Sequence, residues 1–125
     1  MAENYKILVV EDNDFVRMQI AKFLEDSGHA VVEAREGNEA TKLIDETFDL
    51  AIVDVRMTPM DGFDFIRAVH GNDINVPIIL ATGDNDPDML ADASNLSVAA
   101  VLMKPVDRER LIATVERTMK KKKRA

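Results

Sequence analysis

The sequence predicts a three-layer α/β sandwich, in which a parallel five-stranded sheet lies between two layers of helices. Two observations support this fold class. Short apolar, β-branched runs recur five times along the 125 residues, and segments with helical apolar spacing separate them. Alternating strands and helices are typical of βαβ units, whose right-handed crossovers place helices on both faces of a parallel sheet. The length favours one compact domain over residues 1–125.

The five apolar runs are expected to be buried strands. Continuous apolarity over so few residues indicates strands that are covered on both faces. In chain order the runs are KILVV (6–10), AVVEA (30–34), DLAIV (49–53), VPIILA (76–81) and VAAVLM (98–103).

Helices are expected between and after these strands. Gly28 is the expected C-cap of the first helix, and Gly37 opens the second. The fourth has Asp86 as its expected N-cap and Pro87 at its first position, but the Asp, Ser and Asn side chains that follow compete for the backbone, so it is the weakest of the five. The apolar positions that define the other helices are Phe15, Val16, Ile20, Phe23 and Leu24; Ala40, Leu43 and Ile44; Phe65, Ile66 and Val69; and Leu111, Ile112, Val115 and Met119.

Composition excludes several classes of protein. Without cysteine, the chain can form no disulfide framework and no thiolate site. The net charge of −7 makes general nucleic-acid binding a poor expectation. The apolar runs are too short to cross a bilayer, and no basic segment precedes the first of them, so we expect a cytoplasmic protein. The basic tail, residues 120–125, is interpreted as the solvated end of the last helix, with a nucleic-acid contact, a membrane contact or a junction to a linker as alternatives.

Polar side chains stand where four of the predicted strands end. In open parallel sheets, ligands bind beyond the carboxyl ends of the strands. The candidate site residues at these ends are Glu11 and Asp12, Asp54, Thr82, and Lys104. Met57 and Met60 are interpreted as packing residues, and His29 and His70 are assigned no role.

These side chains point to phosphoryl chemistry. If the first and third strands are neighbours, three carboxylates converge, and oxygen ligands of this kind suit Mg²⁺. A lysine and a threonine hydroxyl can hold phosphoryl oxygens, and a carboxylate is the nucleophile available at these strand ends. Each residue alone has an ordinary explanation as a turn, a helix cap or a surface lysine. Their joint occurrence at the ends of four strands favours the functional interpretation.

The motifs resemble those of a known family. VVEDN (9–13), IVDVRMTPMDG (52–62), ATG (81–83) and MKP (103–105) are similar, in order and approximate spacing, to the receiver domain of bacterial two-component response regulators. The resemblance covers essentially the whole chain. It implies the flavodoxin-like fold of the chemotaxis receiver, with strand order 2-1-3-4-5 and five helices.

The resemblance also implies roles for individual residues. Asp54 would accept a phosphoryl group from the phosphohistidine of a sensor histidine kinase or a phosphotransfer protein. Glu11, Asp12 and Asp54 would hold Mg²⁺ together with the backbone carbonyl of Arg56, and Thr82 and Lys104 would bind the phosphoryl group. The domain would then control a downstream effector protein or output domain, and it would catalyse only its own phosphorylation and dephosphorylation.

Two departures from the family pattern concern loop shape and signal output. Pro59 stands one place later than the usual proline after the aspartate, and Val101 replaces the usual aromatic three residues before the lysine. We therefore expect output through the loop and weak helix of residues 83–96. Two alternatives stay open: a receiver-like scaffold that is independent of phosphate, and a haloacid-dehalogenase-like Mg²⁺ phosphatase, which Arg56 disfavours because it stands where that family has a second acid.

Overall fold

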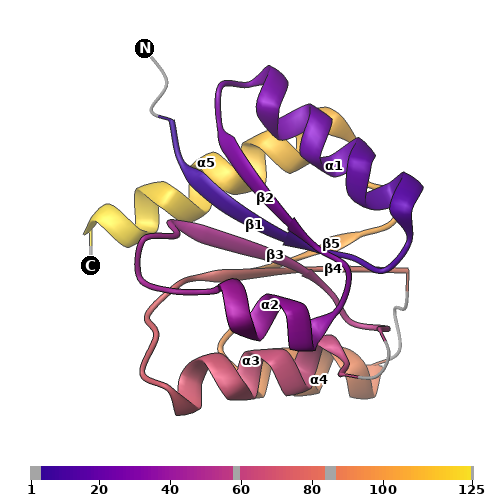
Figure 1. The fold of residues 1–125 in the computed structure, drawn as a ribbon, viewed down its shortest axis with the longest axis vertical. Coiled ribbons are helices and arrows are strands. Elements are labelled where there is room, and N and C mark those ends of the chain that lie inside the picture. The colour runs from indigo at the N-terminus through magenta and orange to yellow at the C-terminus, as the bar shows by residue number, and fades with distance from the viewer. Residues whose placement is uncertain (1–3, 58–59, 84–86, 125) are drawn as a thin grey trace.

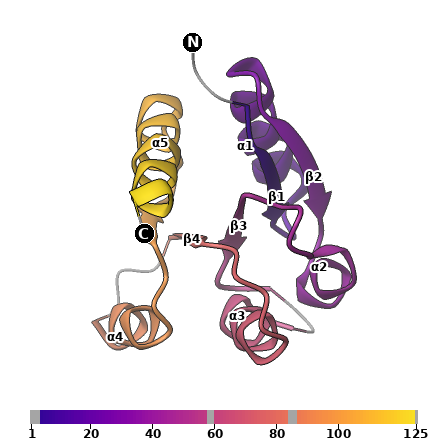
Figure 2. The ribbon, with the colours of Figure 1, turned by 90° about the vertical axis from the view of Figure 1, so that its left-hand side faces the viewer.

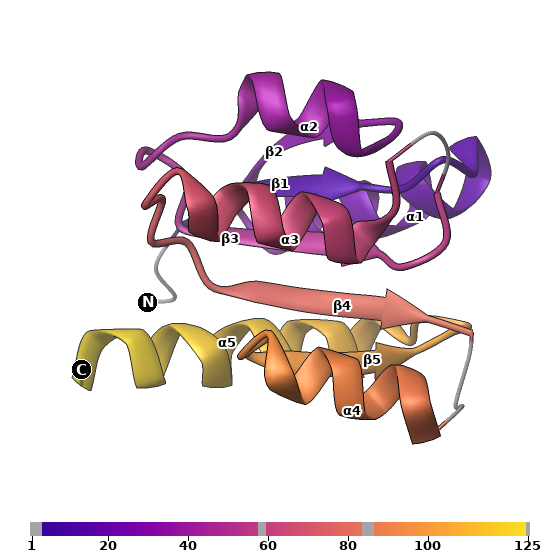
Figure 3. The same cartoon turned by 90° about the horizontal axis from the view of Figure 1, so that it is seen from below.

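The computed structural model describes residues 4–57, 60–83 and 87–124, with side chains up to residue 122. Five parallel strands form one sheet in the order β2-β1-β3-β4-β5, which confirms the predicted fold class. Helices α1 and α5 cover one face of the sheet, and α2, α3 and α4 cover the other (Figures 1 and 2). Figure 3 shows the layer formed by α2, α3 and α4 in front of the sheet. Within the described residues, no helix has the length and apolarity that a bilayer crossing needs.

Strands and helices alternate as the sequence predicts. Asp54 is itself the last residue of β3, while β4 and β5 begin later than the apolar runs that predicted them. The elements are β1 Lys6–Val10, α1 Asp14–Asp26, β2 Ala30–Ala34, α2 Gly37–Leu43, β3 Leu50–Asp54, α3 Gly62–Gly71, β4 Ile78–Thr82, α4 Pro87–Asn95, β5 Ala100–Met103 and α5 Arg108–Arg124.

The ends of α1 follow from local side-chain chemistry. The Asn13 side chain caps its amino end by accepting a 3.0 Å hydrogen bond from the backbone N–H of Val16. The prediction of Gly28 as C-cap is wrong by one residue, because Ser27 is the C-cap. Gly28 follows it with φ of 94° and donates its N–H to the Glu25 carbonyl, the left-handed position that glycine accepts most readily.

Burial of all five strands on both faces is confirmed for the centre of the sheet and wrong at its edges. Strands β3 and β4 are buried throughout, and β1 is buried except at Lys6. Strand β2 exposes Ala30 and Glu33, and β5 buries only Leu102. An edge strand has one neighbour instead of two, and the helices overlap it only in part.

Two apolar clusters, one on each face of the sheet, form the core. Phe65 and Leu80 lie fully buried in the cluster beneath α2, α3 and α4, while Leu24 and Leu111 lie in the cluster beneath α1 and α5. Met57 belongs to the first cluster and is 4% exposed, which agrees with its interpretation as a packing residue. Phe15 was expected on the apolar face of the first helix, but it is 75% exposed.

Some expectations fall on residues outside the described part of the chain. These are Asp86 as the N-cap of the fourth helix, the shifted proline at position 59, and the loop residues 84–86. The fourth helix itself is present as α4, with Met89 and Ala93 buried.

Candidate functional site

The site lies at the edge of the sheet where the carboxyl ends of four strands meet. Strand pairing aligns Val10 with Val53, so the residues that follow β1 stand beside the end of β3. Asp54 pairs with Ala81, and Thr82 pairs with Met103. The backbone N–H of Lys104 donates a 2.8 Å hydrogen bond to the Thr82 carbonyl, which ties the ends of β4 and β5 together. The parallel sheet thereby brings together groups up to 93 residues apart, such as Glu11 and Lys104.

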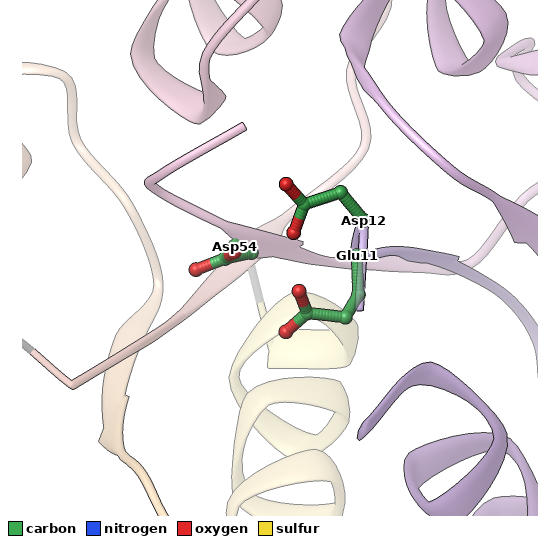
Figure 4. Close-up of side chains that lie close together, drawn as sticks. All are labelled: Glu11, Asp12 and Asp54. Atoms are coloured by element: carbon green, nitrogen blue, oxygen red, sulfur yellow. The ribbon is translucent and has the colours of Figure 1, made fainter. Parts of the chain in front are cut away.

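Three carboxylates converge at this edge. Glu11, Asp12 and Asp54 each place one carboxylate oxygen within 4.8 Å of the others. Figure 4 shows the Glu11 and Asp12 side chains reaching toward the end of β3, where Asp54 stands. Glu11 and Asp54 are 2% and 6% exposed, whereas Asp12 faces solvent. Two buried carboxylates at such short range require positive charge nearby.

Lys104 supplies part of that charge. Its ammonium forms an ion pair with Glu11 and a second one with Asp54, in which Nζ lies 3.2 Å from Oδ1. Burial lowers the pKa of Lys104, but the hydrogen bond with Glu11 and the charges of Asp54 and Glu11 outweigh it, so the pKa lies above its ordinary value. The lysine is therefore fully protonated at neutral pH.

The crowding of the three carboxylates affects the pKa of Asp12. Desolvation, a hydrogen bond with Glu11 and the charge of Glu11 together raise the pKa of the Asp12 carboxyl, and a backbone hydrogen bond and the charge of Lys104 only partly offset them. With three carboxylates facing one ammonium, the cluster has two excess negative charges when its acids are ionised. An all-oxygen donor set with this charge fits a hard divalent cation such as Mg²⁺.

An open depression adjoins the acidic cluster. Asp54, Arg56, Thr82, Gly83 and Lys104 line it, so it joins the ends of β3, β4 and β5. Thr82 is 1% exposed, and Gly83 beside it is exposed. The arrangement places a hydroxyl, an ammonium and a carboxylate around one small space, as the sequence predicted.

Gly62 fixes the path of the chain behind Asp54. Its N–H donates a 2.9 Å hydrogen bond to the Val55 carbonyl, and the preceding residue, Asp61, caps α3 by accepting from the backbone N–H of Asp64. A Cβ atom at Gly62 would collide with the Asp54 carbonyl oxygen and lie 3.0 Å from the Val55 Cα. The start of α3 therefore sits directly against the backbone of the candidate site.

Sequence reasoning missed Arg17, which is 6% exposed. Its guanidinium donates to the Glu11 backbone carbonyl at 2.9 Å, to Asp14 at 2.6 Å and to Glu33 at 3.1 Å. Arg17 thus anchors the turn that carries Glu11 and Asp12. The signal was visible, because Arg17 shares the helical spacing of the buried residues Ile20, Ala21 and Leu24.

Val101 is only partly buried. It packs against the apolar cluster beneath α2, α3 and α4, and strand pairing sets it beside Leu80. A small apolar contact with the core therefore stands where the resemblance implies an aromatic side chain.

Comparisons with known proteins agree on one family. The model of the response regulator receiver domain matches residues 7–116. The chemotaxis protein CheY of Listeria monocytogenes is 30% identical over 92% of this chain and 98% of its own length. The structure of Vibrio cholerae CheY4 superposes with a TM-score of 0.85 at 30% identity, covering 93% of this chain and 99% of that one.

Other relatives are longer proteins. The CAI-1 autoinducer sensor kinase/phosphatase CqsS of Vibrio cholerae is 35% identical, but the match covers 88% of this chain and only 17% of CqsS. The transcriptional regulatory protein PhoP of Escherichia coli is 29% identical, and the chain spans 52% of its length. The chain therefore spans about half or less of these two relatives, but nearly the whole of the Listeria CheY.

Proposed function

Because the chain belongs to the response regulator receiver domain family, a signalling family of two-component systems, we propose that it accepts a phosphoryl group on Asp54 in the presence of Mg²⁺. The observation that carries this proposal is the meeting of three carboxylates, Lys104 and Thr82 at one end of the sheet. Membership of the family also sets aside the phosphatase alternative. The chain acts as a signalling domain and not as a classical enzyme.

The transfer forms one bond and breaks another. A carboxylate oxygen of Asp54 attacks phosphorus, the bond between phosphorus and the donor's histidine nitrogen breaks, and the electron pair leaves with the imidazole. Hydrolysis reverses the modification, because water attacks phosphorus and frees the Asp54 carboxylate. The chain catalyses only these two steps on itself.

The residues around Asp54 have separate tasks. Lys104, which now pairs with Asp54, stabilises the negative charge that the phosphoryl oxygens bring, and the Thr82 hydroxyl donates to one of them. Glu11, Asp12 and Asp54 would hold Mg²⁺ through their carboxylate oxygens, together with the backbone carbonyl of Arg56. When bound there, the cation would supply charge neutralisation for the transferring group.

The partners follow from the same chemistry. The donor is a sensor histidine kinase or a phosphotransfer protein in the cytoplasm, and the acceptor of the signal is an effector protein or an output domain. The domain itself binds neither nucleic acid nor membrane. The signal leaves through α4 and the segment before it, because phosphorylation draws Thr82 toward the phosphoryl group and Val101 offers no ring to reorient.

Intact-mass measurement after incubation with acetyl phosphate tests the proposal. The unmodified chain should gain one phosphoryl group when Mg²⁺ is present and none when Mg²⁺ is chelated. Asp54→Asn should gain none, while Asp26→Asn, a matched change at an exposed acid, should behave like the unmodified chain. Undiminished labelling of Asp54→Asn would overturn the assignment of Asp54, and lack of labelling in the unmodified chain would favour a phosphate-independent scaffold.

A further inference from the structure

A second hollow lies at the opposite end of the sheet from the acidic cluster. It opens between the amino ends of β4 and β5, where Val76 to Ile78 and Val98 to Ala100 form part of its wall, and it has a volume of about 760 Å³. Helix α5 borders it on one face of the sheet, and the end of α3 borders it on the other. Its size falls in the range of small-molecule sites, roughly 300–1,000 Å³.

The charge of the hollow is opposite to that of the chain. Acids outnumber bases 23 to 16 in the sequence, yet no Asp or Glu among the described residues lines this space. The cations on its wall are Arg117, Lys121 and Lys122 of α5, and His70 of α3 adds a ring that can be protonated. Lys122 donates to the Asp49 carbonyl at 3.3 Å, but neither Arg117 nor Lys121 has an ion-pair partner within the described residues. Two cations are therefore available to a ligand.

A threonine on the wall is also available. Thr114 and Thr118 lie one helical turn apart on α5, both are at least nine-tenths buried, and both line the hollow. The Thr114 hydroxyl donates to the Arg110 carbonyl at 2.8 Å. The Thr118 hydroxyl, 6% exposed as a residue, has no hydrogen bond to any part of the chain that the structure describes. Because no buried side-chain nitrogen or oxygen of the described residues lacks a hydrogen-bond partner, the Thr118 oxygen is accessible from the hollow, where it can donate to a ligand's polar head.

The rest of the wall indicates what the uncharged part of the ligand is. Its aliphatic surface is formed by Ile66, Val76, Ile78, Leu96 and Val98. Within the part of the chain that the structure describes, the wall has no Phe, Tyr or Trp on which a nucleobase could stack. Apolar area and uncommitted positive charge occur side by side, so the complementary molecule has an aliphatic part and an anionic end.

We propose that this hollow binds a small amphipathic anion, an aliphatic chain with a carboxylate or phosphate head. The head pairs with Arg117 and Lys121 and accepts from the Thr118 hydroxyl, while the chain covers the aliphatic wall. Because Leu96 and Val98 follow α4 directly, the ligand contacts the segment that joins α4 to β5. The site shares no residue with the acidic cluster and does not depend on phosphorylation.

Titration of the full chain with octanoate and with octyl phosphate, below their micelle concentrations, tests the proposal by amide NMR shifts. We expect saturable shifts in residues 96–100 and around Thr118, and comparison of the two probes identifies the preferred head. The double variant Arg117→Gln with Lys121→Gln should bind at least about 10-fold more weakly, because charge-assisted hydrogen bonds are lost. Thr118→Val, which keeps the shape and removes the hydroxyl, should bind several-fold more weakly.

Three controls make the outcome decisive. Lys42→Gln removes a cation on the distant helix α2 and should leave the dissociation constant unchanged. Octyltrimethylammonium should not bind, and inorganic phosphate should bind far more weakly than octyl phosphate. The proposal is overturned if neither octyl anion saturates, if the cationic probe binds equally well, or if phosphate alone matches octyl phosphate, since the hollow would then lack charge selectivity or an apolar subsite.

Discussion

Replacing Gly62 by alanine should destabilise the protein and slow phosphorylation together. The added methyl group would collide with the Asp54 carbonyl oxygen and crowd the Val55 Cα at 3.0 Å. Both obstacles are backbone atoms of β3 and its continuation, so no side chain can rotate away to relieve them. Either α3 must shift outward or the end of β3 must move.

The magnitude follows from the cost of overpacking. Inserting a methyl group into a tightly packed place costs about 1–3 kcal/mol. For a chain of this length, each kcal/mol lowers the melting temperature by roughly 3–6 °C, so the melting temperature should fall by at least about 3 °C. Because Asp54 itself carries the obstructing carbonyl, the initial rate of acetyl phosphate labelling should fall by on the order of 10-fold or more.

Gly71→Ala is the matched control on the same helix. A Cβ at Gly71, the last residue of α3, meets nothing within 4 Å, and its backbone is not in the left-handed region. This change should be neutral or stabilise by about 0.4–1 kcal/mol, because it restricts the unfolded chain. Thermal melts followed by circular dichroism measure both variants. If Gly62→Ala melted within about 1 °C of the unmodified chain, or if Gly71→Ala lost as much stability, the steric argument would be wrong.

Three further expectations concern the acidic cluster and its output. The raised pKa of Asp12 means that its ionised form is disfavoured in the folded state, so the free energy of unfolding falls as pH rises through about 3.8 and above. Without metal, Asp12→Ala should therefore melt at a higher temperature than the unmodified chain, yet Mg²⁺ should raise its melting temperature by less. Equal increases of the two melting temperatures in a magnesium titration would contradict the shared site. Arg17→Gln should lower the free energy of unfolding by about 1.5–3 kcal/mol and weaken Mg²⁺ affinity, and Arg17→Lys should restore part of both. Denaturant melts measure the stability, and calorimetry measures the Mg²⁺ affinity. An unchanged affinity would show that the role of Arg17 is purely structural. Beryllofluoride with Mg²⁺, which stands in for the phosphoryl group, should change hydrogen exchange most in residues 83–96 and little in α1, also in Val101→Tyr; a larger change in α1 would move the output surface elsewhere.

The alternation of strand and helix patterns in the sequence determined the layers of the fold, and the polar residues at the ends of the strand patterns determined the place of the candidate site. Apolar runs of strand length alternate with helical spacing, and parallel strands must end at the same edge. Glu11, Asp12, Asp54, Thr82 and Lys104 could therefore be assigned to one place, because each follows or ends a run that reads as a strand. Local sequence signals were sufficient for this assignment, because it needs only the period of the apolar residues and the residue at which that period stops.

Only the tertiary structure decided how these groups are paired. Edge strands β2 and β5 are as apolar as central ones in sequence, but their partial exposure depends on their single neighbours. The ion pair of Lys104 with Glu11 joins residues 93 positions apart, and Arg17 reaches Glu33 on the next strand as well as the turn before its own helix. Which cation neutralises which buried carboxylate depends on distances across strands that are neighbours in space and not in sequence, and electrostatic energy depends on those distances. The cationic hollow at the amino ends of β4 and β5 has the same origin, since α3, the start of β4, the segment after α4 and α5 contribute its wall from four stretches of the chain.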